Sequence, residues 1–289
     1  MRNATDIAAL QARHGLSYHI PFCEQADSLV GLRGKKVLEV GGSLPASLVL
    51  DTYGAEQWVA VEEADYWTET LSTGHVQGTP PAQGGPRHRL AEASAATLQP
   101  HQVLFGRIED LPASLHGHFD LVFSIAAFEH IAQLPEALER MRDALRPGGR
   151  LFTLFSPLWS SAFGHHLPEI EDAKGQRYNF THSPIPPWGH LTMRPMELFD
   201  HLLASGCDAA TARRIVYFVH QSPHISRHFL DDYREIVQRC SLRPLLIHPV
   251  FEQPVPPHLL AQLQARWPGR QDFAHAGLLL VLERAATLS

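Results

Sequence analysis

The stretch Lys36-Val37-Leu38-Glu39-Val40-Gly41-Gly42-Ser43 decides the fold of this chain. Its apolar half, 37–40, has the composition of a short buried strand, and small residues separate it from a helical pattern at 47–50. A strand, a tight turn and a helix N-terminus place backbone N–H groups beside one concave site, which suits a nucleotide-like ligand. Glu39 would repel a phosphate but can accept hydrogen bonds from an amine. We therefore expect an aminoacyl nucleoside rather than a dinucleotide.

Strands and helices alternate along the rest of the chain. Further buried strands are predicted at 58–61, 103–105, 119–124, 150–155, 214–219 and 277–282. Helices are predicted at 6–13, 24–32, 90–98, from Pro135 to Leu145, 196–204 and 227–240, and a Pro- and Gly-rich surface loop at 79–86. This pattern predicts an α/β fold with a doubly wound, seven-stranded, mostly parallel sheet and cap insertions.

The composition of the chain limits the classes of protein to which it can belong. The 289 residues are 44% hydrophobic and 19% charged, enough for one large α/β domain. With a net charge of −6 and no run of Lys or Arg, we expect no nucleic-acid partner. The longest apolar run, 277–282, is too short to cross a bilayer, and the first residues lack the apolar core of a secretion signal. Three cysteines without motif spacing are expected to be free thiols in the cytoplasm.

Several polar or small residues fall where predicted strands end. Ligands of doubly wound sheets bind at the carboxyl ends of the strands, near the point where the strand order reverses. Glu62 ends the second strand about twenty residues after Gly41, the separation at which an acidic side chain binds a ribose diol. Glu39, Ile108 and Ser124 fall at the same edge, so the sequence predicts one ligand site there.

Residues 36–155 resemble the core of class I S-adenosylmethionine-dependent methyltransferases. The motifs that carry the resemblance are Val37-Leu38-Glu39-Val40-Gly41-Gly42, Glu62, Ile108-Glu109-Asp110-Leu111-Pro112, Phe119-Asp120-Leu121-Val122-Phe123-Ser124 with Phe128-Glu129-His130-Ile131, and Leu145-Arg146-Pro147-Gly148-Gly149-Arg150-Leu151. The resemblance implies S-adenosylmethionine as cofactor and an antiparallel edge formed by the last two strands. It also implies the cofactor contacts: Glu39, Gly41, Gly42 and Ser43 at the methionine end, Glu62 on the ribose, Ile108 and Glu109 near the adenine, and the Ser124 backbone at the methionine amine.

Three positions depart from the family pattern. Ser43 and Pro45 stand where the family usually has glycines. We expect Ser43 to cap the following helix and Pro45 to fit its first turn. Arg107 stands where many members carry an acid for the adenine amino group, which leaves the adenine contact open.

The chain is divided into an N-terminal helical cap at 1–35 and a methyltransferase domain at 36–289. The cap either covers the ligand site or only covers hydrophobic surface. A loop at 156–194, rich in His, Pro and aromatic residues, follows the fifth strand and is expected to contact the substrate. Residues 222–272 form a second insertion, which we interpret as a substrate cap or a dimer contact.

Methyl transfer requires alignment of the acceptor with the methyl group and, for a hydroxyl or ammonium acceptor, removal of a proton. Histidine suits that role because its pKa lies near working pH. The candidates are His130, His166 and His190, with His165 beside them. Glu129 and His130 could also join one of these histidines as metal ligands, but we predict no bound metal.

These observations predict a methyltransferase for a small-molecule acceptor. Oxygen is favoured as the methyl acceptor over nitrogen or carbon, and secondary-metabolite or saccharide biosynthesis is the expected context. The acidic chain, the polar and aromatic loop and the large cap support this reading. The alternatives are an S-adenosylmethionine-binding enzyme with another reaction, such as cyclisation, and a non-catalytic binding subunit. The sequence leaves open whether the chain forms a homodimer.

Overall fold

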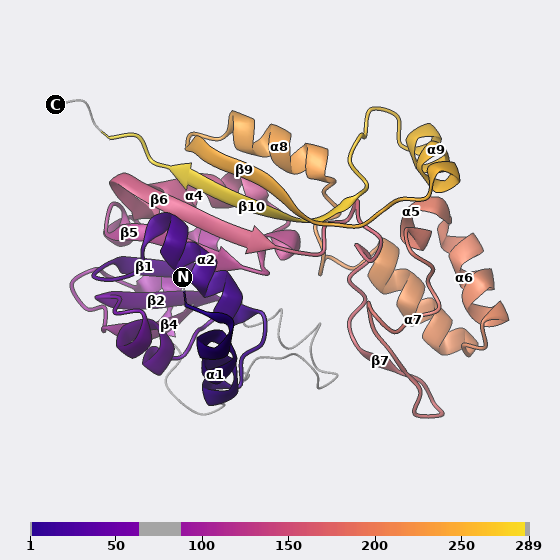
Figure 1. Ribbon diagram of the computed structural model, residues 1–289, viewed down its shortest axis with the longest axis horizontal. Helices are drawn as coiled ribbons and strands as arrows, with labels where there is room; N and C mark the ends of the chain where they lie inside the picture. The colour runs from indigo at the N-terminus through magenta and orange to yellow at the C-terminus, as the bar shows by residue number, and fades with distance from the viewer. Residues whose placement is uncertain (1, 64–87, 287–289) are drawn as a thin grey trace.

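A computed structural model describes residues 2–63 and 88–286. A central sheet carries helices on both faces, and a second, mostly helical lobe lies beyond one end of it (Figure 1). The strand order is β3-β4-β2-β1-β5-β6-β10-β9, with β10 antiparallel to both of its neighbours. The strands are β1 (Lys36–Val40), β2 (Gln57–Glu62), β3 (His88–Arg89), β4 (His101–Phe105), β5 (Phe119–Ile125), β6 (Leu145–Phe155), β9 (Arg243–Glu252) and β10 (His275–Glu283).

Side chains alternate across this sheet and form two buried layers. Val37 and Phe123 belong to the cluster that packs against α2 (His19–Val30), beside α1 (Ala4–His14). Leu38 and Val122 point to the opposite cluster, which includes the apolar faces of α4 (Leu134–Ala144) and α8 (Leu230–Arg239). Because neighbours on a strand face opposite sides, the continuous apolar runs of β1 and β5 fill both layers.

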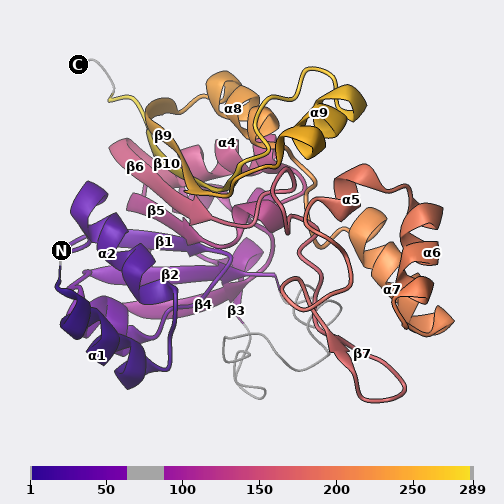
Figure 2. The same cartoon turned by 45° about the vertical axis from the view of Figure 1, so that its right-hand side comes forward.

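The second lobe has its own hydrophobic cluster. It contains α5 (Gly189–Thr192), α6 (Pro195–Ala204), α7 (Ala209–His220), α9 (Pro257–Arg266) and the hairpin of β7 (Ile170–Glu171) with β8 (Arg177–Tyr178). Trp159, Trp188 and Phe273 are buried in this cluster. The lobe is built by chain segments that follow β6 and precede β10, and it stands apart from the sheet in both views (Figures 1 and 2).

The predicted doubly wound, mostly parallel sheet is confirmed, but it has eight strands instead of seven because the short β3 pairs with β4, and one predicted strand is misplaced. Residues 214–219, predicted as a strand, lie inside α7. Asp208 caps that helix by accepting hydrogen bonds from the N–H groups of Ala210 and Thr211, and the buried Ile215 and Val219 are four residues apart, as a helix requires. The β-branched and aromatic residues of 215–219 favoured a strand, but the cap and the burial spacing select the helix.

The missing strand is β9, which lies within the insertion predicted at 222–272. Pro244 and Pro249 made this stretch look irregular. Proline removes a backbone donor and is tolerated at a sheet edge, and β9 is the edge strand beside β10. The final two strands are therefore antiparallel, as the resemblance implies, although the first of them is not the one predicted.

Two smaller predictions are also wrong. The helix expected at 90–98 is only one 3₁₀ turn, Leu90–Glu92, because no large apolar side chain follows Leu90 one helical turn later. Met196 and Leu203 of α6, expected in the core, are exposed. The surface loop predicted at 79–86 lies outside the described residues. None of the helices in the described part of the chain has the length and apolar composition of a membrane span.

Leu38→Ala tests the central strand. Leu38 is fully buried in β1, so its truncation is expected to lower the free energy of unfolding by about 2–5 kcal/mol. Leu245→Ala on the edge strand β9, where the side chain is 42% exposed, is the matched control and should change it by no more than about 0.5 kcal/mol. Urea unfolding of both variants measures the difference. Equal losses would contradict the assignment of β1 to the core.

Candidate functional site

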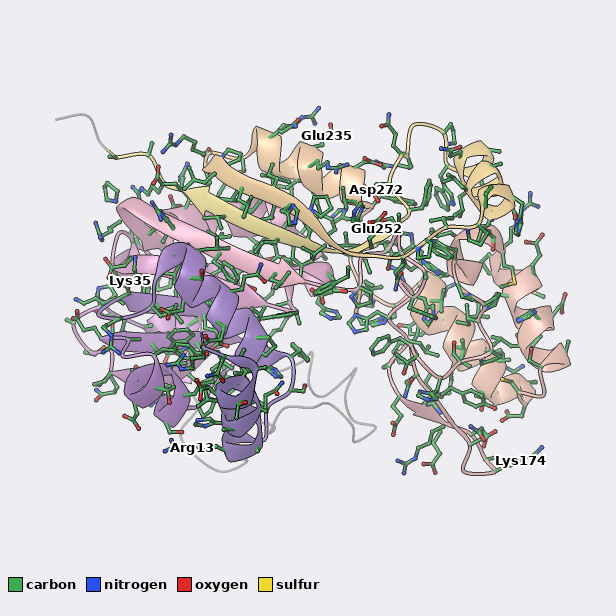
Figure 3. The ribbon with its side chains drawn as sticks, viewed as in Figure 1. Arg13, Lys35, Lys174, Glu235, Glu252 and Asp272 are labelled. Atoms are coloured by element: carbon green, nitrogen blue, oxygen red, sulfur yellow. The ribbon has the colours of Figure 1, made fainter. Side chains whose placement is uncertain are left out.

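The strands of the sheet converge on a site that faces the second lobe. Lys35, just before β1, lies at the end of the sheet away from that lobe, whereas Lys174 marks the tip of its β7–β8 hairpin (Figure 3). The parallel strands therefore direct their carboxyl ends toward the lobe. Because β1 lies between β2 and β5, the strand order reverses at β1, which is where ligands of such sheets bind.

The ends of β1 and β5 are joined directly. The Ser124 hydroxyl, fully buried, donates a hydrogen bond of 2.8 Å to the Val40 carbonyl. Gly41 follows with a φ of +83°, and its N–H donates to the Val61 carbonyl of β2 at 3.0 Å. A Cβ at Gly41 would lie 2.3 Å from the Cβ of Ala127, so only glycine fits this turn. The turn is thus held between β2 on one side and the segment after β5 on the other.

Glu39 stabilises that turn through hydrogen bonds of its carboxylate. Its Oε2 accepts hydrogen bonds from the Leu44 N–H at 3.0 Å and from the Trp58 indole N–H at 2.5 Å. Burial raises the pKa of Glu39 to about 7, although these two bonds oppose the rise, and nearby Glu62 adds to it. One carboxylate oxygen is therefore used by the protein itself, and the contact of Glu39 with an amine stays a prediction.

Glu62 is the acid best placed for a ligand hydroxyl. It ends β2, is 3% exposed, and its Oε2 has no hydrogen-bond partner. Burial raises the pKa of Glu62, while a hydrogen bond with Ser43 opposes the rise. Ser43 therefore binds Glu62 and does not cap the following helix η1 (Ser47–Thr52), whose N-cap is Ala46 without a side-chain bond. The expectation that Ser43 caps the helix is wrong, because the carboxylate offers it a stronger acceptor.

The predicted adenine side is formed by the turn after β4. Ile108 is buried in the 3₁₀ turn η3 (Ile108–Asp110), and the carboxylate of Glu109 forms an ion pair of 2.9 Å with Arg107. Arg107 is half-exposed and neutralises the neighbouring acid. Ile108 offers an apolar surface, as an adenine ring requires, and the contact itself stays a prediction. The unpartnered oxygen of Glu62 and the glycine turn at Gly41 fit the expected cofactor.

A second polar group lies just past β5. Glu129 and His130 belong to the 3₁₀ turn η5 (Phe128–His130), and His166 comes from the loop after β6. The rings of His130 and His166 are 4.7 Å apart between centroids, and one donor atom from each of the three side chains lies within 4.8 Å of the others. The structure therefore brings together two of the three predicted catalytic histidines.

Glu129 is the most constrained member of this cluster. It is 1% exposed, and neither carboxylate oxygen has a partner with hydrogen-bond geometry. Burial raises its pKa to about 8, although the backbone N–H groups of Glu129 and Ser156 lie close enough to oppose the rise. A buried polar group without a partner is costly, so Glu129 is a candidate for contact with a bound group.

His224 supports the cluster, although no sequence pattern distinguishes it from the other histidines among the nineteen of the chain. Its carbonyl accepts a hydrogen bond from Nδ1 of His130, and its Nε2 donates to the carbonyl of His166 at 3.1 Å. His166 itself has a φ of +42°. The segment before α8 thus fixes both histidines, which no local pattern in the sequence indicates.

His190, the third predicted catalytic histidine, lies in the second lobe, outside this cluster. Its Nε2 bonds to the Trp159 carbonyl at 2.8 Å, and its ring contacts that of His165 at 5.5 Å, inside the second lobe. Burial lowers the pKa of His190 to about 3, so it is neutral at working pH. His165 and His190 therefore form a separate pair that serves packing within that lobe.

The N-terminal segment reaches this region. Tyr18, between α1 and α2, has a pKa raised to about 12, mainly by burial and in addition by the charge of Glu129. Tyr233 of α8 is also close enough to Glu129 for its pKa to be raised by it, and it bonds Ser226 at 2.9 Å. Elements from both ends of the chain thus surround Glu129.

Comparisons with known proteins agree with this geometry. Residues 86–153 match the family model described as a methyltransferase domain. A search of curated proteins finds no match to the sequence.

Solved structures give weak likenesses. An S-adenosylmethionine-dependent methyltransferase from Mesorhizobium loti is 14% identical, with 93% of this chain and 98% of that chain covered and a TM-score of 0.44. A geranyl diphosphate methyltransferase bound to GPP and sinefungin is 11% identical, with 92% and 79% covered and a TM-score of 0.45. A chain of the complex between the Haloferax volcanii Trm112 methyltransferase activator and a methyltransferase is 14% identical, with 98% and 95% covered and a TM-score of 0.43. These values indicate nothing about acceptor or partner.

Gly41→Ala tests the cofactor turn. The added methyl group collides with Ala127, so we expect at least a tenfold loss of S-adenosylmethionine affinity in calorimetry. Gly175→Ala is the matched control, because Gly175 also has a positive φ, +80°, but no heavy atom within 4 Å of the added carbon. Unchanged affinity in Gly41→Ala, or the same loss in both variants, would contradict the proposed turn.

Glu39→Gln tests the buried acid through pH. Since burial raises the pKa of Glu39 to about 7, the neutral form is favoured in the folded protein, and its stabilising contribution is lost as pH rises toward and through 7. Between pH 5 and pH 8 the melting temperature of the wild type should therefore fall relative to that of the variant by roughly 5 °C or more. Glu56→Gln, at the exposed Glu56, should follow the wild type. Parallel curves for wild type and Glu39→Gln would refute the buried, raised-pKa state.

Proposed function

We propose that this chain, whose residues 86–153 match a methyltransferase-domain model, is a class I S-adenosylmethionine-dependent methyltransferase that methylates a hydroxyl group of a small-molecule acceptor. When bound, the cofactor supplies a methyl group on a sulfonium, which is already activated for displacement. The protein must therefore hold the acceptor in line with that methyl group and accept the hydroxyl's proton.

The cofactor would be held by the edge formed by β1, β2 and β4. The turn at Gly41 permits close approach of the backbone, and Glu62 offers an unpartnered carboxylate oxygen to the ribose hydroxyls. Ile108 would cover the adenine. Glu109 and the backbone of Ser124 stay predicted contacts, at the adenine and at the amine.

The single observation that carries the choice of acceptor is the buried group of Glu129, His130 and His166. Glu129 and His130 follow β5 and His166 follows β6, and within the described residues both oxygens of Glu129 and Nδ1 of His166 lack a hydrogen-bond partner. A hydroxyl is both a donor and an acceptor, so it can satisfy a carboxylate and a neutral imidazole together. Oxygen methylation fits this pair better than transfer to carbon, which needs no such acceptors.

A small acceptor fits the enclosure of this group. Glu129 is only 1% exposed and lies beside His166 of the loop after β6, and the chain is acidic overall. A polyanionic substrate would be repelled by that charge. We place the acceptor in secondary-metabolite or saccharide biosynthesis, since such compounds carry hydroxyl groups on compact frameworks.

The reaction is expected in the cytoplasm, without a nucleic-acid or membrane partner. Cys23, Cys207 and Cys240 are free thiols, which is typical of a reducing compartment. The chain acts alone or as a homodimer.

His130→Asn and His166→Asn test the acceptor side. Methyl transfer to a hydroxyl forms an O–C bond, breaks the S–C bond and releases a proton, and loss of the group that handles this proton typically lowers turnover by about 10²–10⁴-fold. We expect that loss in both variants with cofactor affinity unchanged. His190→Gln, which keeps a donor for the Trp159 carbonyl, should stay within about tenfold of the wild type.

The assay measures adenosylhomocysteine formed with a panel of sugars and phenols, and mass spectrometry locates the added methyl group. A methyl group on nitrogen or carbon would refute oxygen methylation. Cofactor binding without adenosylhomocysteine, or with a cyclised product, would favour the binding subunit or the other reaction.

A further inference from the structure

The donor atoms of Glu129, His130 and His166 have the spacing of a ligand set. They come from two segments about forty residues apart in sequence, yet all lie within 4.8 Å of one another. Tetrahedral ligands at about 2.0–2.1 Å from a zinc ion are about 3.4 Å apart. A side-chain movement of about 1 Å is therefore enough to close these three donors around one ion.

The carboxylate in this set needs a positive partner. Glu129 is 1% exposed, and its two oxygens lack hydrogen-bond partners. Among its neighbours in the described part of the chain, Tyr18 and Tyr233 are neutral phenols and His130 and His166 are imidazoles, so none of these four side chains is a permanent cation. A bound cation would stabilise the ionised form of this buried carboxyl group, which burial alone disfavours.

The orientation of His130 is the second observation. A carbonyl only accepts hydrogen bonds, so Nδ1 of His130 must carry the proton that bonds to the carbonyl of His224. In the neutral ring, Nε2 then carries the lone pair. Metal-binding histidines typically donate their other N–H to a backbone carbonyl in this way. His224 also donates a hydrogen bond to the backbone carbonyl of His166, so one residue holds the ring of His130 and the backbone of His166.

We propose that Glu129, His130 and His166 bind one divalent first-row transition-metal ion. Two imidazoles and a carboxylate favour such an ion over Mg²⁺ or Ca²⁺, which prefer oxygen ligands. Three protein ligands leave at least one position open for an exogenous group, as in catalytic sites. This replaces the sequence-based expectation that no metal binds.

The inference deepens the proposed function and rests on it for the role of the ion. An acceptor hydroxyl that coordinates the ion has a lowered pKa, so its proton passes to water before or during attack on the methyl carbon. His130 and His166 then position the acceptor through the ion and need not take the proton themselves. The ion-binding site itself is independent of which acceptor is used.

The test uses the full chain, freed of metal by chelation, and Co²⁺ as the probe. We expect one equivalent of Co²⁺ to bind, with visible absorption bands of a low-coordinate complex and heat in calorimetry. Glu129→Gln, His130→Asn and His166→Asn should each weaken binding by at least about 100-fold. In His130→Asn the amide N–H can still bond the His224 carbonyl, and asparagine tolerates the positive φ of His166, so both folds should be kept.

His165→Asn is the matched control. His165 is the neighbouring buried histidine outside the cluster, and the asparagine oxygen can still accept from the Leu167 N–H, so Co²⁺ affinity should not change. No binding by the wild type up to millimolar Co²⁺ would overturn the inference. Wild-type affinity in all three cluster variants, or equal loss in His165→Asn, would place the ion elsewhere and overturn it too.

The two proposals fail separately. Full methyl transfer by metal-free protein that binds no Co²⁺ would remove the metal site and keep the function. Tight Co²⁺ binding that the three variants lose, without any methyl transfer to hydroxyl acceptors, would keep the metal site and remove the proposed function.

Discussion

The contact between the carboxyl ends of β1 and β5 is the constraint on which the rest of the site depends. The hydrogen bond from Ser124 to the Val40 carbonyl and the close approach of Gly41 to Ala127 leave no room between the two strands. They fix the turn that would receive the cofactor and, within a few residues, the turn that carries Glu129. The donor side and the acceptor side are therefore two ends of one rigid junction, which is the alignment that methyl transfer needs.

Buried carboxyl groups whose ionisation is disfavoured are the common property of this junction. Glu39, Glu62 and Glu129 all have raised pKa values, chiefly because of burial. In the described part of the chain their oxygens are bonded to neutral donors or lack a partner. A sulfonium nucleoside and a divalent ion are both cations, so each would relieve part of this cost. The site is thus preorganised for positively charged ligands, at the expense of stability in their absence.

The sheet could be predicted from the sequence, because β1, β2, β5 and β6 are continuous apolar runs and end in recognisable motifs. The errors have local causes. The prolines of β9 argued against a strand, but proline is tolerated in an edge strand. The β-branched residues of α7 favoured a strand, but the Asp208 cap selects the helix. The cofactor residues lie at strand ends and follow from register. The support of His130 by His224 depends on a contact between segments 94 residues apart, which no periodic pattern encodes.

The chain enters the second lobe after β6 and leaves it before β10. The buried side chains of the lobe form a cluster of their own. The packing of the lobe is therefore separate from the packing of the sheet. Substitutions inside the lobe can thus leave the packing of the strands unchanged. Proteins of this architecture can therefore differ in the group that they methylate while they keep the same strands for the methyl donor.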